Sequence, residues 1–127
     1  MANKIEFTVP LVPPSVNHYK VRYRNGRTVV SGKAIAFKEA VAVFCRGRYV
    51  TGKTFSVGMG IFLGKKDKGD VDNFPKLVLD GLADCGVFRN KKGERVSDAH
   101  VRYMVVSING DDRPEQGLTE ITVEALN

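Results

Sequence analysis

Four stretches of the chain either alternate between apolar and polar residues or are rich in β-branched ones. Residues 4–9 (KIEFTV) and 55–61 (FSVGMGI) place every second, apolar side chain on one face, which is typical of a strand with one buried face. Residues 99–109 (AHVRYMVVSIN) and 118–126 (LTEITVEAL) are rich in β-branched side chains, and the polar sequence between them favours a turn. The pattern therefore predicts four strands.

Two other stretches repeat apolar residues at intervals of three and four, the spacing of a helix with one buried face. The first helix is expected between Ser31, a favourable N-cap, and Gly47, a favourable residue just past a C-terminus. Its expected buried residues are Ala34, Phe37, Val41 and Phe44. The second helix is expected to begin near Asp72 or Asn73, because Pro75 is tolerated only in a first helical turn. Its expected apolar stripe consists of Phe74, Leu77, Val78, Leu82 and Cys85.

These elements predict an α/β fold of the mixed α+β kind, in which two main helices pack on one mixed β-sheet. A chain of 127 residues is long enough for one core, so a single domain over residues 1–127 is expected. No apolar run is long enough to cross a bilayer and the first residues lack the apolar run of a signal peptide, so we expect a cytoplasmic protein without a membrane partner. In that compartment Cys45 and Cys85 are expected to stay reduced.

A basic hairpin is expected between the first strand and the first helix. Asn25 and Gly26 lie between two alternating arms, and this pair favours a tight hairpin turn because both residues tolerate positive φ. The arms combine basic residues with tyrosines, a composition suited to binding phosphates and stacking on bases. The candidate DNA-binding residues of this region are Arg22, Arg24, Arg27 and Lys33. The alternative is a solvated hairpin with no partner.

Charge is distributed unevenly between the two halves of the chain. Residues 1–64 contain ten basic and two acidic residues, whereas residues 65–127 contain ten basic and twelve acidic ones. The overall net charge is +6. This distribution suits a protein that attracts a polyanion, such as nucleic acid, with one region and performs carboxylate chemistry with the other. The alternative is a charge that only keeps a small protein in solution.

Residues 47–54 (GRYVTGKT) match the letters of a phosphate-binding ATP loop. In such a loop the phosphates face the N-terminus of the helix that follows. Here the expected helix precedes the motif and a strand follows it, so the stretch is predicted to join a helix to a strand. We therefore expect neither ATPase activity nor a nucleotide cofactor.

The most informative polar residues lie at the start of the second helix. Asp70 and Asp72 are two apart in an extended approach and Lys76 is four residues further on, so these three side chains are expected to converge at the positive helix N-terminus. Two close carboxylates need a cation between them, and Mg²⁺ prefers oxygen ligands and retains water for attack on a phosphate. Lys76 would then stabilise charge on the phosphate. The alternatives are a helix cap for Asp72, a turn for Asp70 and an ordinary ion pair for Lys76.

Four stretches, in the same order over nearly the whole chain, resemble the RusA family of Holliday-junction resolvases. They are PPSVN (13–17), RYRNGRTVVS (22–31), GDVDNFPKLVLDGLADCGVF (69–88) and SDAHV (97–101). The resemblance implies a homodimeric, magnesium-dependent endonuclease that nicks four-way DNA junctions symmetrically. It also implies that Asp70, Asp72 and Asp98 are catalytic and bind the metal, and that Lys76 is the catalytic lysine. An alternative within the same fold is a module that binds junctions without cleaving them.

The chain departs from the family pattern at two positions. Gly69 stands where many members carry a basic residue, so the phosphate contact made there is either lost or taken over by Lys68. Ser97 precedes Asp98, where members often have a second acidic residue. His100 lies two residues after Asp98, and we expect it to be structural rather than a proton carrier.

Overall fold

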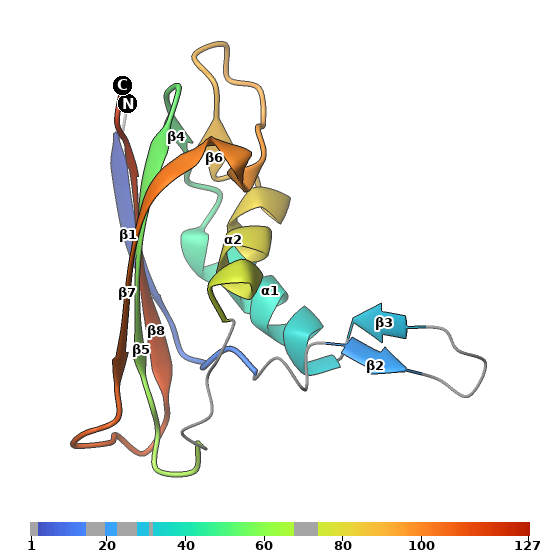
Figure 1. Ribbon diagram of the computed structural model, residues 1–127, viewed down its shortest axis with the longest axis vertical. Helices are drawn as coiled ribbons and strands as arrows, with labels where there is room; N and C mark the ends of the chain where they lie inside the picture. The colour runs from blue at the N-terminus through green and yellow to red at the C-terminus, as the bar shows by residue number, and fades with distance from the viewer. Residues whose placement is uncertain (1–2, 15–19, 23–27, 31, 68–73) are drawn as a thin grey trace.

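The computed structural model describes residues 3–14, 20–22, 28–30, 32–67 and 74–127. Within these ranges the chain forms one mixed sheet covered by two helices, so the predicted fold class is confirmed (Figure 1). In the described ranges no helix is long and apolar enough to cross a membrane.

The four predicted strands form the main sheet in the order β1-β8-β5-β7. The strands are β1 (Lys4–Val9), β5 (Phe55–Phe62), β7 (Val101–Asn109) and β8 (Leu118–Ala125). β8 pairs antiparallel with both β1 and β5, whereas β5 and β7 are parallel. Parallel neighbours need a long crossover connection, and the chain between β5 and β7 contains a helix that serves this purpose.

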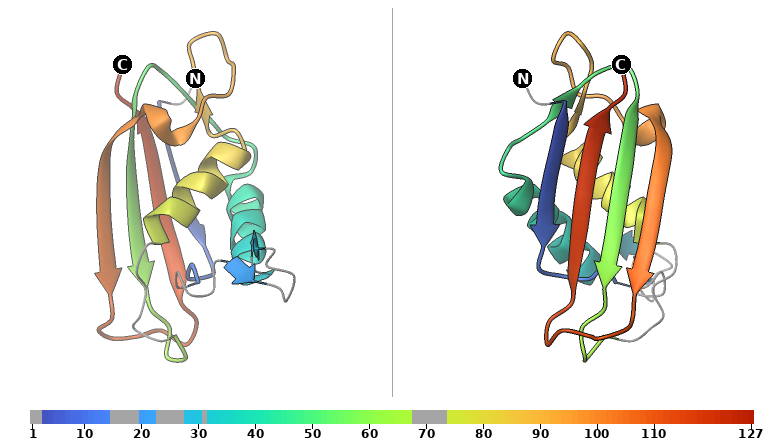
Figure 2. Two further views of the ribbon diagram at one scale, coloured as in Figure 1. Left: turned by 45° about the vertical axis from the view of Figure 1, so that its right-hand side comes forward. Right: turned by 90° about the vertical axis from the view of Figure 1, so that its left-hand side faces the viewer.

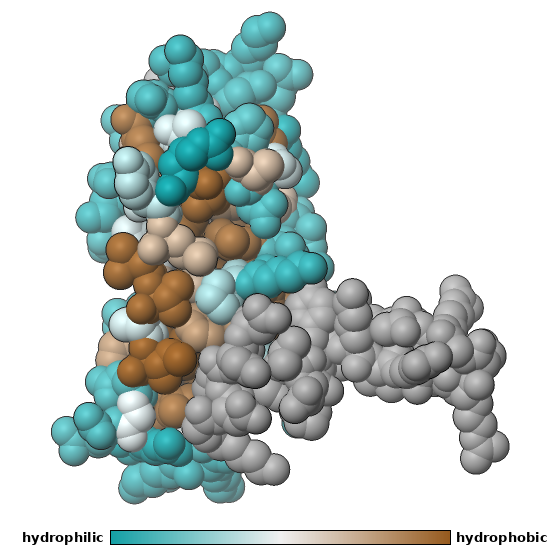
Figure 3. Space-filling model, viewed as in Figure 1, coloured by the Kyte–Doolittle hydropathy of each residue, from teal (hydrophilic) through white to brown (hydrophobic). Residues whose placement is uncertain are grey.

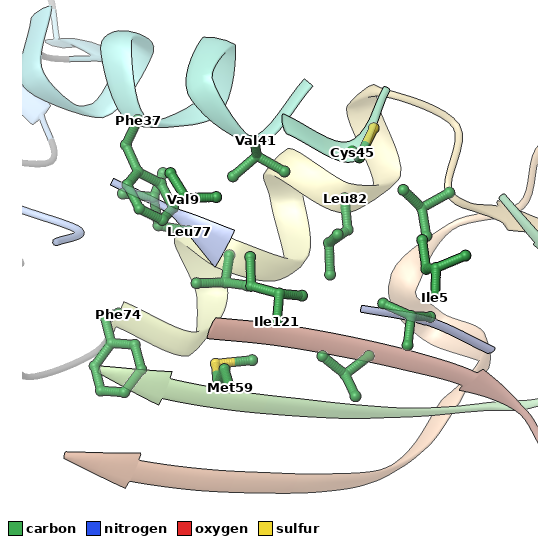
Figure 4. Close-up of a cluster of buried hydrophobic side chains, with 14 of the residues drawn as sticks. Ile5, Val9, Phe37, Val41, Cys45, Met59, Phe74, Leu77, Leu82 and Ile121 are labelled. Carbon is green, nitrogen blue, oxygen red and sulfur yellow. The ribbon is translucent and has the colours of Figure 1, made fainter. Parts of the chain in front are cut away.

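Both helices, α1 (Gly32–Cys45) and α2 (Phe74–Asp84), lie on one face of the sheet, and Figure 2 shows the other face without a covering layer. The core lies between the helices and this face, as the side chains in Figure 4 show. The two helices pack against each other at Gly81, where an added Cβ would lie 3.5 Å from the Val41 Cβ. This is an ordinary van der Waals distance, so the space between the two helices would also accommodate a methyl group.

The buried stripe of α1 differs from the expectation at its end. Ala34, Phe37 and Val41 are buried as predicted, but Cys45 takes the last buried position and Phe44 is 37% exposed. A residue four positions after Val41 remains over the core, whereas one three positions after it has rotated towards the solvent. The helix then ends with Arg46 (φ 57°) and Gly47 (φ 70°) in the left-handed region, which agrees with the stop predicted at Gly47.

Short elements complete the fold. β2 (Lys20–Arg22) and β3 (Thr28–Val30) pair antiparallel as the two arms of the predicted hairpin, whereas its predicted turn at Asn25 and Gly26 lies outside the described residues. The sequence did not predict the short parallel pair of β4 (Val50–Thr51) and β6 (Phe88–Arg89). The strand predicted over residues 99–109 begins two residues later than expected, at Val101, as β7. Asp98–His100 form a 3₁₀ turn, η2, before it.

The two cysteines are free and close to each other. The Sγ atoms of Cys45 and Cys85 lie 3.6 Å apart, with Cys45 buried and Cys85 half-buried. Burial, together with the neighbouring Cys45, raises the pKa of the Cys85 thiol to about 12. Cys85 therefore keeps its proton at neutral pH, which suits a thiol packed beside the helices.

Candidate active site

The first turn of α2 presents Lys76 to the solvent. α2 begins at Phe74, with Pro75 as its second residue, in agreement with the position predicted from the proline. Phe74, Leu77 and Val78 are buried, so Lys76 is left on the exposed side of the helix. In the described part of the chain its ammonium group takes part in no ion pair. Lys76 thus has no ion-pair partner among the described residues, and Asp72, four residues before it in the alternative of an ordinary ion pair, lies outside them.

The segment that carries Asp70 and Asp72 lies outside the described residues, but its flanks are held firmly. On the N-terminal side, the backbone N–H of Gly64 donates to Asp67 Oδ2 (2.6 Å) and Arg113 Nη1 donates to the carbonyl oxygen of Asp67 (2.6 Å). On the C-terminal side, the Phe74 side chain is 3% exposed and forms part of the core. The described residues on either side of this segment are therefore held by a hydrogen-bonded turn and by a buried helix start.

The turn before this segment needs glycine at position 117. A Cβ on Gly117 would collide with Asp67 Oδ2 and Val12 Cγ2. We therefore predict that Gly117→Ala destabilises the protein by about 1–3 kcal/mol, the range for overpacking, and lowers DNA cleavage by displacing residues 64–67. Urea denaturation and a cleavage assay would measure the two effects.

Gly58→Ala is the matched control for this substitution. A Cβ on Gly58 would meet only Thr122 Cβ, at 3.7 Å, which is ordinary van der Waals contact. Both the free energy of unfolding and the cleavage rate are expected to change little. Equal losses in the two variants would contradict a special role for the turn at Asp67.

Asp98 is placed next to α2 by a short turn rather than by the strand itself. Ser97 Oγ accepts a hydrogen bond from the Ala99 N–H (3.2 Å) and caps η2, whose first residue is Asp98. η2 contacts α2, and β7 continues from it beside β5. The Asp98 side chain is half-exposed, and its carboxylate makes no hydrogen bond or ion pair with other described residues. Asp98 thus retains free oxygen ligands on an element that packs on the helix of Lys76.

The predicted metal site lies only partly within the described residues. Within those residues no three His, Cys, Asp or Glu side chains are grouped to hold a metal ion. Of the three predicted ligands only Asp98 is described, because Asp70 and Asp72 fall in residues 68–73, together with Asn73. The carboxylate donors of the predicted set are hard oxygen ligands, which fit Mg²⁺. His100 is half-buried in η2, and its predicted structural role remains a prediction.

The predicted DNA-binding region lies at one end of the molecule. The β2–β3 hairpin projects from the end at which α1 and α2 both begin (Figure 1). Lys33 is exposed in the first turn of α1, and Arg22 is the last residue of β2. Arg24, Arg27 and Lys68 lie outside the described residues. Two helix N-termini, which carry partial positive charge, therefore face the same end as the hairpin.

The ATP-like stretch GRYVTGKT connects α1 to β5, as predicted. The glycine, lysine and threonine of this stretch all contact Asn127. A Cβ on Gly52 would lie 2.6 Å from the Asn127 carbonyl oxygen, which leaves room only for glycine. The Lys53 N–H donates to the same oxygen (2.8 Å), and Thr54 Oγ1 donates to Asn127 Oδ1 (2.9 Å). No helix follows the glycine and lysine, because the next element is the strand β5. The structure thus gives these residues a local role in holding Asn127.

Sequence reasoning missed Arg113, which links two loops far apart in the chain. Its Nη1 donates to the carbonyl oxygen of Asp67 and its Nε to that of Gly110 (3.1 Å). The only signal in the sequence was the run of turn-forming residues around positions 64–67 and 110–117.

Comparison of the chain with known protein families and with curated proteins found no match. The family resemblance therefore rests on the motifs themselves. The described structure adds the placement of Lys76 and Asp98 on two elements in contact.

Proposed function

We propose that the protein is a magnesium-dependent, structure-selective DNA endonuclease that resolves four-way junctions by symmetric nicking of opposing strands. The observation that supports the proposal is the contact between α2, whose first turn carries Lys76, and η2, whose first residue is Asp98. In the sequence, Asp70 and Asp72 directly precede α2. Carboxylates together with an exposed lysine suit phosphodiester hydrolysis.

Each residue has a distinct proposed role. Asp70, Asp72 and Asp98 would hold Mg²⁺, which when bound supplies positive charge and a water molecule of lowered pKa. Lys76 would donate hydrogen bonds to a phosphate oxygen and stabilise the charge that develops there. Its exposed ammonium, which forms no ion pair with the described residues, is consistent with this role, since a lysine already held in an ion pair would first have to be released.

DNA would be held through its phosphates at the end of the molecule where the hairpin and both helix N-termini lie. Arg22, Arg24, Arg27, Lys33 and Lys68 are the proposed contacts. Two symmetric nicks require two sites and each chain offers one, so the proposed enzyme is a homodimer. We place it in the cytoplasm, the compartment expected from the sequence.

Binding of a junction is predicted to weaken steeply with salt, and Lys33→Ala should reduce this dependence. Each phosphate contact contributes about 0.9 to the slope of log K against log salt, so the slope should fall by about that amount. Fluorescence anisotropy of a labelled junction in magnesium-free buffer would measure it. Lys91→Ala is the control, because Lys91 is an exposed lysine in the turn between β6 and η2, away from the hairpin. Equal slopes for the two variants and the wild type would contradict a contact at Lys33.

The proposal is tested by mapping cleavage of a synthetic four-way junction strand by strand, with magnesium or with a chelator. Paired nicks on opposing strands that need magnesium are expected. Asp72→Asn, purified in the same way, should bind the junction without nicking it, which also excludes a contaminating nuclease. Asp98→Asn tests the third ligand in the same assay.

Two other outcomes would overturn the proposal. A folded wild-type protein that binds the junction but never nicks it would identify a non-catalytic junction-binding module. A protein that does not bind the junction would retain only the fold and the motif.

A further inference from the structure

The two edges of the main sheet differ in how they are protected. At the β1 edge, Arg48 Nη1 donates to the carbonyl oxygen of Glu6 (3.2 Å), and the guanidinium lies over the Phe7 ring, 5.7 Å from its centroid. Lys4 and Glu6 add charges to this short strand. Charges and covering groups of this kind keep an edge from pairing with another strand. The β1 edge is therefore protected at Glu6 and Phe7.

The β7 edge lacks such protection. β7 pairs with β5 on one side only, and within the described residues no side chain is hydrogen-bonded to the backbone of residues 103–108. Arg102 is its one charged residue, and the strand contains no proline. A strand of nine residues, about 30 Å long, therefore offers unpaired backbone donors and acceptors along its outer side.

β7 also exposes apolar side chains on both of its faces. Tyr103 is 67% exposed and Val105 69% exposed on the uncovered face of the sheet, where they neighbour Ser56 and Gly58 of β5. On the helix side the exposed residues are Met104 (45%), Val106 (39%) and Ile108 (49%). Figure 3 shows apolar surface on the side of the molecule where β7 lies. A long, apolar edge strand without protection normally has a partner.

We infer that β7 is the surface at which a second copy of this chain docks, by antiparallel pairing of the two β7 strands about a twofold axis at Val105. This inference rests on the proposed function in one respect: the proposed function supplies the expectation that the partner at β7 is a second copy of the chain. A twofold axis pairs a surface with itself, so the surface must be self-complementary. Centred on Val105, the pairing places Met104 opposite the partner's Val106 and Tyr103 opposite the partner's Ser107, without like charges facing each other.

The exposed apolar area of β7 supplies part of what a dimer needs. At the exposed fractions above, the five apolar side chains expose on the order of 500 Å² per copy, and edge-to-edge pairing covers the parts of them that face the partner strand together with the backbone, against ~800 Å² per partner in a standard interface. The same pairing brings each Arg102 towards the end of the other β7, where the following turn carries Asp111 and Asp112. Opposite charges thus meet at both ends of the paired strands.

The test compares the mass in solution of three proteins without DNA or magnesium, by analytical ultracentrifugation: the wild type, Val105→Lys and Val43→Lys. Val43 on α1 is 67% exposed and thus matches Val105 in type and exposure. We expect the wild type and Val43→Lys to be dimers. Val105→Lys should be a monomer at the same concentrations, because two ammonium groups would meet across the axis.

A second measurement does not depend on the lysine variants folding. Val105→Cys should form a disulfide between copies with diamide, which accepts the two electrons and two protons released, because residues directly opposite in antiparallel strands have Cβ atoms close enough to be bridged. Val43→Cys keeps the same native cysteines and should remain uncrosslinked.

The inference is overturned if the wild type is a monomer. The β7 edge would then be a surface that binds an extended segment of another protein. It is also overturned if Val105→Lys stays dimeric, if both lysine variants become monomers, or if Val43→Cys crosslinks as readily as Val105→Cys. Cleavage is a separate readout. A β7 dimer that does not nick junctions would refute only the proposed activity, and a nicking enzyme that is dimeric in Val105→Lys would refute only this surface.

Discussion

Lys76→Met is expected to reduce the rate of junction nicking about 100-fold or more under single-turnover conditions, while junction binding changes little. Methionine retains most of the length of the lysine side chain and favours the helix, so α2 should be preserved. The substitution removes a donor that acts on charge developing at the phosphate, and loss of one such donor typically costs about 100- to 1000-fold in rate. A quenched-flow or gel assay with excess enzyme and saturating magnesium would measure the rate of the cleavage step.

Lys91→Met is the matched control, because it removes the same charge from an exposed lysine in the turn before η2. Its nicking rate should equal that of the wild type. If Lys76→Met cleaved at the wild-type rate, or lost cleavage only because it no longer bound the junction, Lys76 would have no role in the chemistry.

Phe74→Ala is expected to lower the free energy of unfolding by about 3–5 kcal/mol, the usual cost of removing a buried phenylalanine side chain. Phe74 is 3% exposed and is the first residue of α2, at one end of the core in Figure 4. Urea denaturation followed by circular dichroism would measure the change. Nicking should also decrease at temperatures where the variant is folded, because the start of α2 fixes one end of the segment with Asp70 and Asp72.

Phe44→Ala provides the comparison, since Phe44 is 37% exposed on α1 and lies off the buried stripe. Its unfolding free energy should fall by clearly less than that of Phe74→Ala, and its nicking rate should be unchanged. An equal loss of stability in both variants would mean that Phe74 does not anchor the helix as its burial indicates.

Periodicity and β-branched content were sufficient to predict the long elements of this fold. Both helices, β1 and β5 lie where the spacing of apolar residues placed them, because a regular element with one buried face must repeat its apolar residues. β7 and β8 lie where β-branched residues placed them, although β7 begins two residues later than expected. Pro75 located the start of α2 for a local steric reason. The short pair β4 and β6 escaped prediction, since two residues are too few to show a repeat and the pairing joins distant parts of the chain.

The candidate site was only partly predictable from the residues. The exposure of Lys76 followed from the helical spacing and is confirmed. Asp98 came from the family resemblance alone, because its position beside α2 depends on a cap at Ser97 and on the packing of η2, which no local pattern reveals. The contact between Arg113 and Asp67 spans 46 residues, so a single sequence offered no way to pair them.

Arg48 has a consequence for the size to which the protein can assemble. Open-ended growth of a sheet requires every added copy to present a fresh edge, whereas a copy joined through β7 presents only its β1 edge. In the proposed pair, the Arg48 guanidinium, which binds the Glu6 carbonyl oxygen and lies over Phe7, would hinder the addition of a third copy at that edge. An arginine within an apparent nucleotide-binding sequence would thus favour assembly that ends at two chains over growth into a fibre.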